Sequence, residues 1–427
     1  MMKMYWLMCL VSIGCGLDSH GKDHCELPSD CLDGFVCDAS GTCVAPMCTP
    51  NPCGAGECGA HPDGCGGTLE CGTCEIPDHC TNGSRDADET DTDCGGTCHA
   101  CATGASCALT SDCATGTCEQ QTCLPGRWTA AAVMPTSRTM LAAVVGNDGL
   151  IYTFGGYLEH GPATGVVEVY NPALDSWSTR APMPTPRYGL SAVVGSDGRI
   201  YTIGGQYDSS VSPSVDGLSV KVEAYSPSTN TWQQLPSLPD GRYLGSAVAA
   251  SNGKIYASGG FSVQPITILG SVVSFAPGDS AWTTSDAMTT SRAGHGTVAI
   301  GNRIYAVGGY DNADNDLRAF EYYQPGLPGW NTLPLMPTAR KMLAAATSGG
   351  RLYAIAGNAP SGANQGVVER YDPATNTWSK AASLVNGRFD HAAVSLPDGR
   401  IFILGGERGG DTTNTTGVVE VYVPDPS

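Results

Sequence analysis

Six arginines recur at one position of a sequence that has few cations. The chain holds 22 lysines and arginines against 41 aspartates and glutamates. The six are Arg138, Arg187, Arg242, Arg292, Arg340 and Arg388. A guanidinium offers several N–H donors in a planar fork that fits carboxylates. Its repetition therefore predicts a pocket for an anionic or polar ligand, such as an acidic sugar or an acidic peptide.

Five glutamates supply a second interpretation of the same arginines. They are Glu168, Glu223, Glu321, Glu369 and Glu420, and Val273 takes this position in the third repeat. Each stands two residues before a repeated aromatic, so the period of a strand places both on one face, where a half-buried carboxylate needs a cation. We favour this structural role for the arginines. Because the third repeat has no glutamate, Arg242 or Arg292 is the arginine most available to a ligand.

All twenty cysteines lie at or before Cys123. Few large apolar residues separate them, so this segment cannot bury a core and needs covalent links. We expect up to nine disulfides of unassigned connectivity from the eighteen cysteines after Cys15. Zinc is the alternative, with ligand-like spacing in Cys71-x-x-Cys74 and Cys98-x-x-Cys101 and with His61, His79 and His99 nearby. We favour disulfides, because zinc requires reduced thiolates.

A cluster of carboxylates lies within this cysteine-rich segment. Asp86, Asp88, Asp91 and Asp93 precede a turn at Gly95 and Gly96. Closely spaced carboxylates could bind a calcium ion through oxygen ligands, although the spacing is not that of a twelve-residue calcium loop. A solvated acidic loop is the simpler interpretation, and we favour it. We expect no other cofactor.

The amino terminus is typical of an export signal. One cation, Lys3, precedes a short apolar run that is too short to span a bilayer. Residues 1–14 are therefore the predicted signal peptide, and Gly14 before Cys15 resembles a lipobox, with Cys15 as the lipidated residue. We expect an outer-membrane or cell-surface lipoprotein, or a secreted protein. The chain has a formal net charge of −19, so we do not expect it to bind nucleic acid or anionic lipid surfaces.

A glycine-ended segment organises the rest of the chain. It recurs six times, at 150–156, 200–205, 255–260, 304–309, 352–357 and 401–406. An aromatic followed seven residues later by tryptophan recurs with it, as in Tyr170 and Trp177. Short β-branched runs alternate with hairpin turn signals such as Asn147-Asp-Gly, and no helical periodicity competes. Each period therefore predicts four short antiparallel strands.

The glycine pair, tyrosine and tryptophan at a period of about fifty residues resemble the kelch repeat. The resemblance covers residues 128–427 and departs from the pattern at Ala356 and Phe275. It implies an all-β, six-bladed propeller. Trp128 has no tyrosine before it and Tyr422 has no tryptophan after it, so we expect the strand at Trp128 to close the last blade. The predicted domains are the signal peptide, a disulfide-stapled stalk at 15–123 and the propeller at 124–427.

This arrangement places the candidate site on one face. In a kelch blade the arginine precedes the innermost strand and the glycine pair ends the next strand, so both lie on the same face beside the channel. Loops of variable length follow the glycine pairs, as binding loops do on a rigid scaffold. They present four aromatics: Tyr157, Tyr207, Phe261 and Tyr310. We expect the arginines and these aromatics to bind a protein or glycan ligand, in a protein that is a monomer.

Two enzymatic functions follow from resemblance to other kelch propellers. A copper radical oxidase would need a tyrosine cross-linked to cysteine, and no cysteine follows Cys123. A carbohydrate-processing enzyme similar to the sialic-acid mutarotases would use His295, His391, Asp390 and Arg388 around the channel. We favour a packing role for the two histidines, because this position in a kelch repeat often holds histidine. An exported binding module is therefore our leading hypothesis, and the carbohydrate-processing enzyme is the alternative.

Overall fold

The computed structural model describes most of the chain after residue 82. The described residues are 83–85, 87, 89–96, 98–159, 161–207, 220–263, 266–359, 366–408 and 415–424, together with four short strands nearer the amino terminus. The predicted signal peptide and the lipidation site Cys15 lie outside them, as do Asp86 and Asp88. No helix among the described residues is long and apolar enough to cross a membrane.

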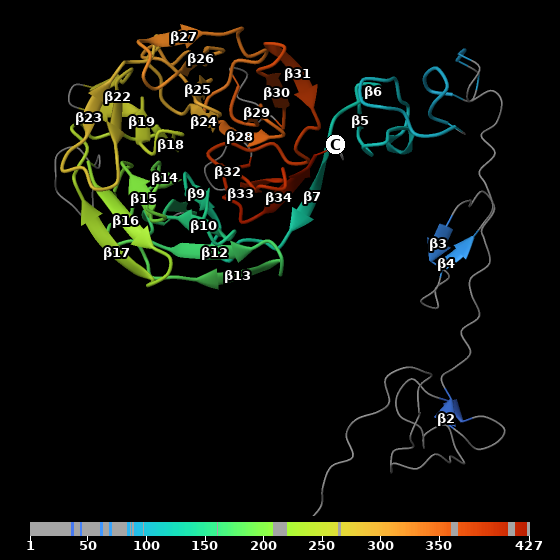
Figure 1. The fold of residues 1–427 in the computed structure, drawn as a ribbon, viewed down its shortest axis with the longest axis horizontal. Coiled ribbons are helices and arrows are strands. Elements are labelled where there is room, and N and C mark those ends of the chain that lie inside the picture. The colour runs from blue at the N-terminus through green and yellow to red at the C-terminus, as the bar shows by residue number, and fades with distance from the viewer. Residues whose placement is uncertain are drawn as a thin grey trace, which may run out of the picture. The chain divides into compact units, whose positions relative to one another are not determined.

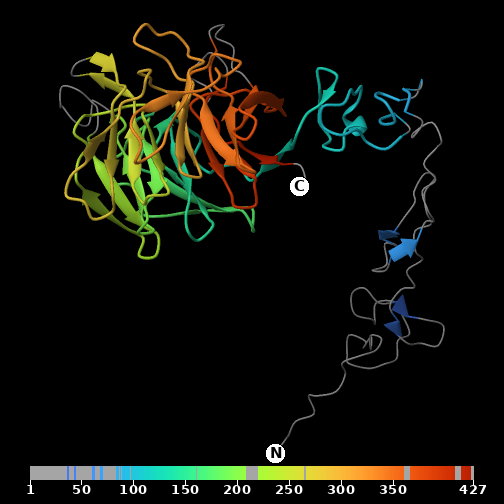
Figure 2. The same ribbon diagram turned by 45° about the horizontal axis from the view of Figure 1, so that its top comes forward.

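Six four-stranded antiparallel sheets stand around a central channel, so the predicted all-β, six-bladed propeller is confirmed (Figure 1). From the channel outward, blade one is β9(142–145), β10(151–154), β12(167–171) and β13(176–179), and blade two is β14(191–194), β15(200–203), β16(222–226) and β17(231–235). Blade three is β18(246–249), β19(255–258), β22(272–275) and β23(283–285), and blade four is β24(296–300), β25(303–307), β26(320–323) and β27(330–332). Blade five is β28(344–348), β29(351–355), β30(368–372) and β31(377–381), and blade six is β32(392–395), β33(401–404), β34(419–423) and β7(127–131). Figure 2 shows the strands running from one face of the ring to the other.

The core lies between neighbouring blades. All four residues are buried in each of β10, β15, β19 and β33, the second strands of their blades. This burial on both faces explains why the glycine-ended segments are continuous apolar runs instead of alternating ones. Aromatic rings join one blade to the next, as where Phe154 of β10 lies 5.8 Å from the ring of Trp232 in β17.

The repeated tryptophan links each blade to the one before it. Its Nε1–H donates a hydrogen bond to a backbone carbonyl in the loop that leaves the preceding blade. The acceptors are the carbonyls of Ala382 for Trp128, Ala132 for Trp177, Ala181 for Trp232, Pro236 for Trp282, Asp286 for Trp330 and Pro334 for Trp378, at 2.7–3.0 Å. A tryptophan in this position therefore supplies both apolar area and a directional bond between blades.

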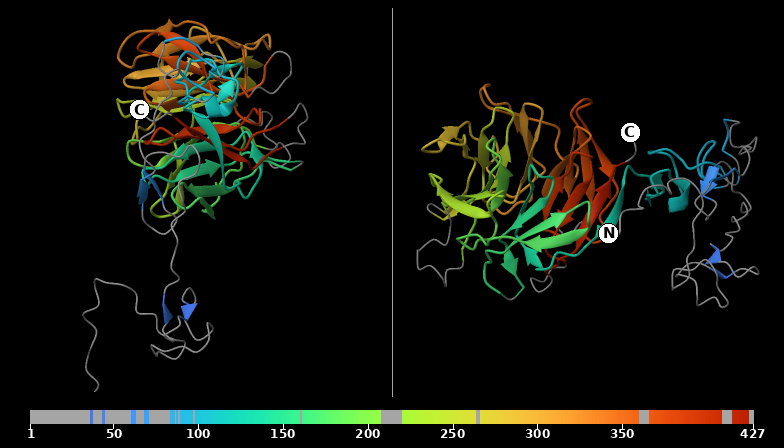
Figure 3. Two further views of the ribbon diagram at one scale, coloured as in Figure 1. Left: turned by 90° about the vertical axis from the view of Figure 1, so that its right-hand side faces the viewer. Right: turned by 60° about the horizontal axis from the view of Figure 1, so that its bottom comes forward.

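The ring closes as the sequence predicts. Strand β7 pairs antiparallel with β34, with Trp128 opposite Tyr422, so the outer strand of the last blade comes from the beginning of the repeat region. The two segments lie side by side at the seam in Figure 3. The Tyr422 hydroxyl also donates to the Pro125 carbonyl at 3.0 Å, which fixes the chain just before β7. Residues almost three hundred positions apart thus hold the ring shut.

The seven cysteines from Cys94 to Cys123 are in disulfides. The pairs are Cys94–Cys101, Cys107–Cys118 and Cys113–Cys123. Cys98 is also in a disulfide, so the Cys98-x-x-Cys101 pair has no free thiols for the zinc site considered above. Cys71 and Cys74 lie outside the described residues. Nearer the amino terminus, β1(36–37) pairs with β2(43–44), and β3(60–62) pairs with β4(68–70).

The last disulfide-bonded loop contacts blade five. Glu119 accepts hydrogen bonds from the backbone N–H and the hydroxyl of Ser383, at 2.8 and 2.7 Å. Lys380 in β31 donates to Gln120 at 2.6 Å. Residues 82–427 form one compact unit and residues 1–81 another. The predicted boundaries at 14/15 and 123/124 stay predictions.

Replacing Trp232 with phenylalanine should lower the free energy of unfolding by about 1–3 kcal/mol, because the Ala181 carbonyl would lose its donor. Denaturation in urea measures this change. Leu174→Ala is the control, since Leu174 is 72% exposed and its truncation should change little. Equal stabilities for the two variants would show that the bond from the indole contributes nothing between blades.

Candidate functional site

Each arginine lies at the inner end of its blade and contacts three parts of it. In blade one, Nη1 of Arg138 donates to the carbonyls of Gly155 and Val166, at 2.7 and 3.0 Å. Its Nη2 donates to the Glu168 carboxylate and to the Thr153 hydroxyl, both at 2.8 Å. The guanidinium thereby donates hydrogen bonds to the carbonyl of the first glycine of the pair, to the carbonyl just before β12 and to the buried carboxylate.

Four other blades repeat this ion pair. The N–O distances are 2.7 Å for Arg187–Glu223, 2.5 Å for Arg292–Glu321 and 2.7 Å for Arg340–Glu369, and Arg388 pairs with Glu420 in the same way. These arginines are 0% exposed, and their glutamates are almost as deeply buried. Burial lowers the pKa of each arginine, and the neighbouring glutamate opposes that effect. A ligand would have to displace an internal carboxylate to bind these side chains, so the geometry favours the structural role.

Arg242 in blade three is the exception that the sequence singled out. Val273 replaces the glutamate, and Arg242 is 3% exposed. Its Nη atoms lie 3.3–3.4 Å from the carbonyls of Ala257, Gly259 and Ser271 and from the Ser271 hydroxyl. Burial lowers the pKa of Arg242 to about 10, and Asp240 opposes that effect. The side chain therefore remains a buried cation at neutral pH, with only long hydrogen bonds to uncharged acceptors.

A closed ring of backbone hydrogen bonds surrounds one end of the channel. It joins the residues two positions after each arginine, which we call the inner ring: Met140, Gly189, Leu244, Gly294, Met342 and Asp390. Each N–H donates to the carbonyl of the ring residue in the preceding blade, at 2.8–3.1 Å, and Met140 donates to Asp390 to close the circle. All six have positive φ, between 52° and 61°. Four of them are not glycine, so no residue type in the sequence marks this conformation.

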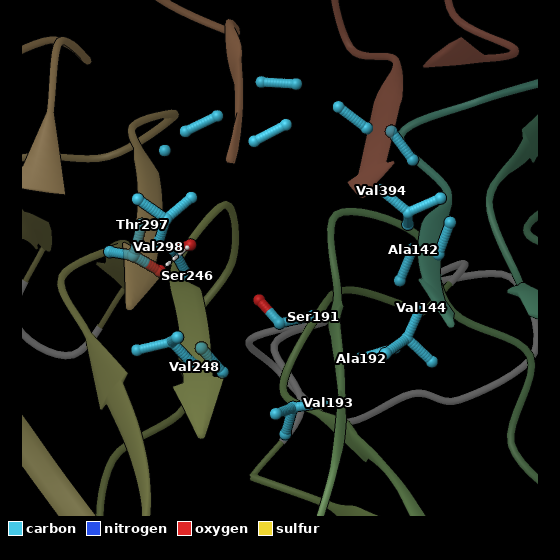
Figure 4. A pocket seen from close by; sticks show the side chains of 18 of the residues that line it. Ala142, Val144, Ser191, Ala192, Val193, Ser246, Val248, Thr297, Val298 and Val394 are labelled. Atoms are coloured by element: carbon cyan, nitrogen blue, oxygen red, sulfur yellow. Dashed lines mark hydrogen bonds between the residues drawn. The ribbon is translucent and has the colours of Figure 1, made fainter. Parts of the chain in front are cut away.

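The channel itself is neutral and lined by small side chains. It has a volume of about 510 Å³, and the innermost strands of all six blades form its wall. Figure 4 shows alanine and valine side chains along this wall, with Ser191, Ser246 and Thr297 among them. The hydroxyls are engaged with the protein, because Ser246 and Thr297 bond each other at 2.6 Å and Ser191 donates to the Gly245 carbonyl. Asp390 is the one acidic or basic lining residue besides two histidines.

The candidate acid–base groups come from two blades, and the two histidines among them are uncharged at neutral pH. Burial lowers the pKa of both His295 and His391 to about 3, so both rings are neutral at pH 7. They belong to blades four and six, and Arg388 is engaged by Glu420. Burial, aided by the Glu407 charge, raises the pKa of Asp390 to about 8. Asp390 is thus a protonated carboxyl at neutral pH without a charged partner of opposite sign.

Aromatic side chains gather on the face where the arginines begin each blade. The residue after the arginine pairs with the residue after the glycine pair, as Tyr157 does with Thr139 and Tyr243 with Phe261. These positions hold six aromatics that we call the aromatic rim: Tyr157, Tyr188, Tyr243, Phe261, Tyr310 and Phe389. The sequence predicted Tyr157, Phe261 and Tyr310 as ligand contacts. It missed Tyr188, Tyr243 and Phe389, although each directly follows one of the repeated arginines.

Rings of the aromatic rim contact one another across blades. Tyr188 lies 5.1 Å from Tyr157 and 5.5 Å from Tyr243, measured between ring centroids. The Tyr243 hydroxyl lies 3.0 Å from the sulfur of Met140 in the inner ring. Lys341 lies 5.4 Å from the Tyr310 ring centroid and pairs with Asp314 at 2.7 Å. The fourth predicted aromatic, Tyr207, is half-buried near Arg187 and does not occupy a rim position.

The carboxylates proposed for calcium are engaged by the backbone where the structure describes them. Asp91 accepts N–H groups from Thr92 and Ser106, at 2.7 and 2.6 Å. Asp93 accepts the N–H of Gly83. The bonds to Ser106 and Thr92 lower the pKa of Asp91. These contacts suit a structured acidic loop, and calcium binding stays a prediction.

Comparison with known families agrees with this geometry. The model of the KLHDC2/KLHL20/DRC7 Kelch-repeats domain matches residues 119–309, and the Kelch motif matches residues 291–337 and 339–385. Together with the six blades, these matches show that the chain belongs to the kelch-repeat β-propeller proteins.

Known proteins resemble parts of the chain. Kelch-like protein 36 of Rattus norvegicus and that of Mus musculus are each 30% identical to it over 106 residues, which is 25% of this chain and 17% of each relative. The match thus spans a small part of those relatives. The solved structure of YjhT superposes with a TM-score of 0.58 at 18% identity, over 67% of this chain and 95% of that one, and shows the same fold.

Replacing Glu223 with alanine should lower the free energy of unfolding by about 3–5 kcal/mol, because Arg187 would remain buried without a counter-charge. Chemical denaturation measures this loss. Arg199→Ala removes a partly exposed ion pair with Asp197 and should cost at most about 1 kcal/mol. If the two variants are equally stable, the buried pairs do not hold the blades.

Asp390 should make stability depend on pH. Its folded pKa of about 8 exceeds the unfolded value near 4, so the folded state retains a proton that the unfolded state releases. The resulting stabilisation is complete below about pH 4 and is lost as the pH rises through about 8. Asp390→Asn should therefore flatten the dependence of unfolding free energy on pH over this range, whereas the surface variant Asp398→Asn should not. Parallel curves for Asp390→Asn and wild type would contradict the buried, protonated carboxyl.

Proposed function

We propose that the chain is an exported, surface-associated binding module whose protein or glycan ligand contacts the aromatic rim. The observation that carries this proposal is the gathering of six aromatic residues from five blades on the face that also bears the variable loops. Tyrosine offers a large rigid ring and a polar hydroxyl at little entropic cost, which suits both sugar rings and protein surfaces. The aromatic rim supplies contact area on a scaffold whose loops differ between blades.

In this proposal the arginines do not contact the ligand and instead hold the backbone that carries the aromatic rim. Each one ties the glycine-pair carbonyl to the start of the third strand, and the residue after each glycine pair belongs to the same face. The arginines thus fix the backbone from which Tyr157, Phe261 and Tyr310 project. Binding is favoured over catalysis because both channel histidines are neutral and Arg388 is paired.

The cysteine-rich segment fits the exported location that we propose. Disulfides persist in oxidising compartments, and the cysteines from Cys94 to Cys123 are oxidised. The segment would act as a stalk, lipidated at Cys15 or secreted, that joins the propeller to the cell surface. The contacts of Glu119 and Gln120 with blade five would hold the end of the stalk against the propeller.

A binding screen with the full-length disulfide-bonded chain tests the proposal. The chain is applied to a glycan array and, separately, used to capture proteins from an extracellular fraction. Tyr157→Ala should weaken binding to the ligand so found at least tenfold, which is about 1.4 kcal/mol. Leu174→Ala removes an apolar side chain that is even more exposed than Tyr157, from an outer hairpin, and should leave the affinity unchanged.

The same screen separates binding from catalysis. Unchanged affinity in Tyr157→Ala, with full loss in Asp390→Asn, would overturn the aromatic rim and move the site to the channel. Turnover of a bound sugar that disappears in Asp390→Asn would support the carbohydrate-processing alternative. Nuclear magnetic resonance of sugar anomers detects such turnover without a coupled assay.

A further inference from the structure

Asp390 is the one ionisable side chain in the inner ring. The other five positions hold methionine, glycine or leucine and make the same backbone hydrogen bonds, so the ring does not need a carboxyl group. Asp390 is 8% exposed, and its carboxyl group forms no hydrogen bond or ion pair with any residue that the structure describes. A buried polar group without a partner is unfavourable. The fold therefore leaves this carboxyl group available to a ligand.

The channel is covered by side chains at the inner ring. The ring of Tyr243 lies over Gly189, where a Cβ would collide with it, and the Tyr243 hydroxyl lies 3.0 Å from the sulfur of Met140. Tyr310 lies over Gly294 in the same way, with Cε1 3.3 Å from the position of a Cβ there. The described residues that line the channel include Asp390 but none of the aromatic rim. Asp390 thus lies at the covered end of the channel.

The channel continues into a second cavity at its other end. This cavity has a volume of about 690 Å³ and is lined by the turns between the first and second strands of blades one, four, five and six. It shares Val145, Ala299, Thr347 and Ser395 with the channel wall, so the two cavities are continuous. The innermost strands between the two ends have four or five residues, which span about 13–17 Å. A ligand therefore reaches Asp390 from the face opposite to the aromatic rim.

The wall of the channel and its covered end suit different parts of one ligand. The alanine and valine side chains of the wall (Figure 4) suit an unbranched aliphatic chain. An ammonium group at the covered end would supply a charge-assisted hydrogen bond to the Asp390 carboxylate. Each innermost strand pairs with another strand on one side only, so its free edge offers backbone carbonyls to the other ammonium protons.

Other classes of ligand fit the channel less well. Calcium takes six to eight oxygen ligands, and Asp390 is the one carboxylate among the described lining residues. An anionic ligand would find no lysine or arginine in this lining. Burial and the Glu407 charge raise the pKa of Asp390 to about 8, because no positive charge lies close enough to oppose them. An ammonium group is the small cation that corrects this imbalance with a single carboxylate.

We propose that the channel binds a primary ammonium ion with an unbranched aliphatic chain. The ammonium group pairs with the Asp390 carboxylate at the covered end, and the chain lies along the wall of alanine and valine side chains. The channel volume of about 510 Å³ is within the usual range for small-molecule sites. This site is separate from the aromatic rim and does not depend on the ligand proposed for it, because the two open on opposite faces.

Isothermal titration calorimetry of the full-length disulfide-bonded chain with pentylammonium chloride tests the site. The titration is made at about pH 8.5, where Asp390, with its pKa of about 8, is mostly ionised. The pentylammonium ion is still charged there, because its amine titrates near the lysine pKa of about 10.4. The wild type should show saturable binding. Pentanol, which has the same chain without the charge, should bind about tenfold more weakly or worse.

Two matched variants separate the buried carboxylate from the negative charge of the whole chain. Asp390→Asn keeps the shape of the side chain and should weaken the binding of pentylammonium about tenfold or more. Asp398→Asn removes a carboxylate whose side chain is 49% exposed and should bind like wild type. Equal affinities of the wild type and Asp390→Asn for pentylammonium would overturn the proposal. So would the absence of saturable binding, or wild-type binding of pentanol as tight as that of pentylammonium.

Crystallography of the wild type gives an answer even if Asp390→Asn fails to fold. Crystals are soaked with a pentylammonium ion that is brominated at its far carbon, and the anomalous signal locates the bromine. A peak within the channel on the side of the second cavity, with the ammonium group at Asp390, supports the site. A bromine beside Asp390, or one bound only outside the channel, rejects it.

Discussion

The propeller depends on one buried guanidinium in each blade. In blade one, Arg138 neutralises the Glu168 carboxylate on the third strand. It also donates hydrogen bonds to two backbone carbonyls, one of them in the glycine pair. Without the guanidinium, the buried Glu168 carboxylate would lose its counter-charge and the Gly155 carbonyl would lose a donor. The ion pair thus links strands within a blade, whereas the hydrogen bond from the repeated tryptophan links that blade to the preceding one. Five of the six blades use both.

Much of this architecture could be predicted from the sequence, because it repeats. The repeat period and the hairpin turns predicted six blades. Trp128 without a preceding tyrosine and Tyr422 without a following tryptophan predicted the closing strand, and these two residues lie opposite each other in the β34–β7 pair. The pairing of arginine with glutamate followed from strand period and from the cost of buried charge. Even the exception at Val273 was visible, since one missing glutamate among six is conspicuous.

The aromatic rim and the inner ring were harder to predict, for different physical reasons. Tyr188, Tyr243 and Phe389 occupy a position that also holds Thr139, Ala293 and Lys341, so no residue type marks it. The inner ring depends on backbone conformation, and Met140, Leu244 and Met342 adopt a left-handed φ that their side chains disfavour. Tertiary hydrogen bonds impose that conformation, and no local pattern carries the information.

The inner ring also determines how the end of the channel acts on charge. At a helix terminus, aligned peptide dipoles add up and attract ions of one sign. In the inner ring, each N–H points to the preceding blade along the circumference, and the bond from Met140 to Asp390 closes the circle. The dipoles of these six N–H···O=C bonds run the same way around a closed circle and sum to nearly zero. The backbone at this end therefore selects neither anions nor cations, and any electrostatic preference of the channel must come from side chains alone.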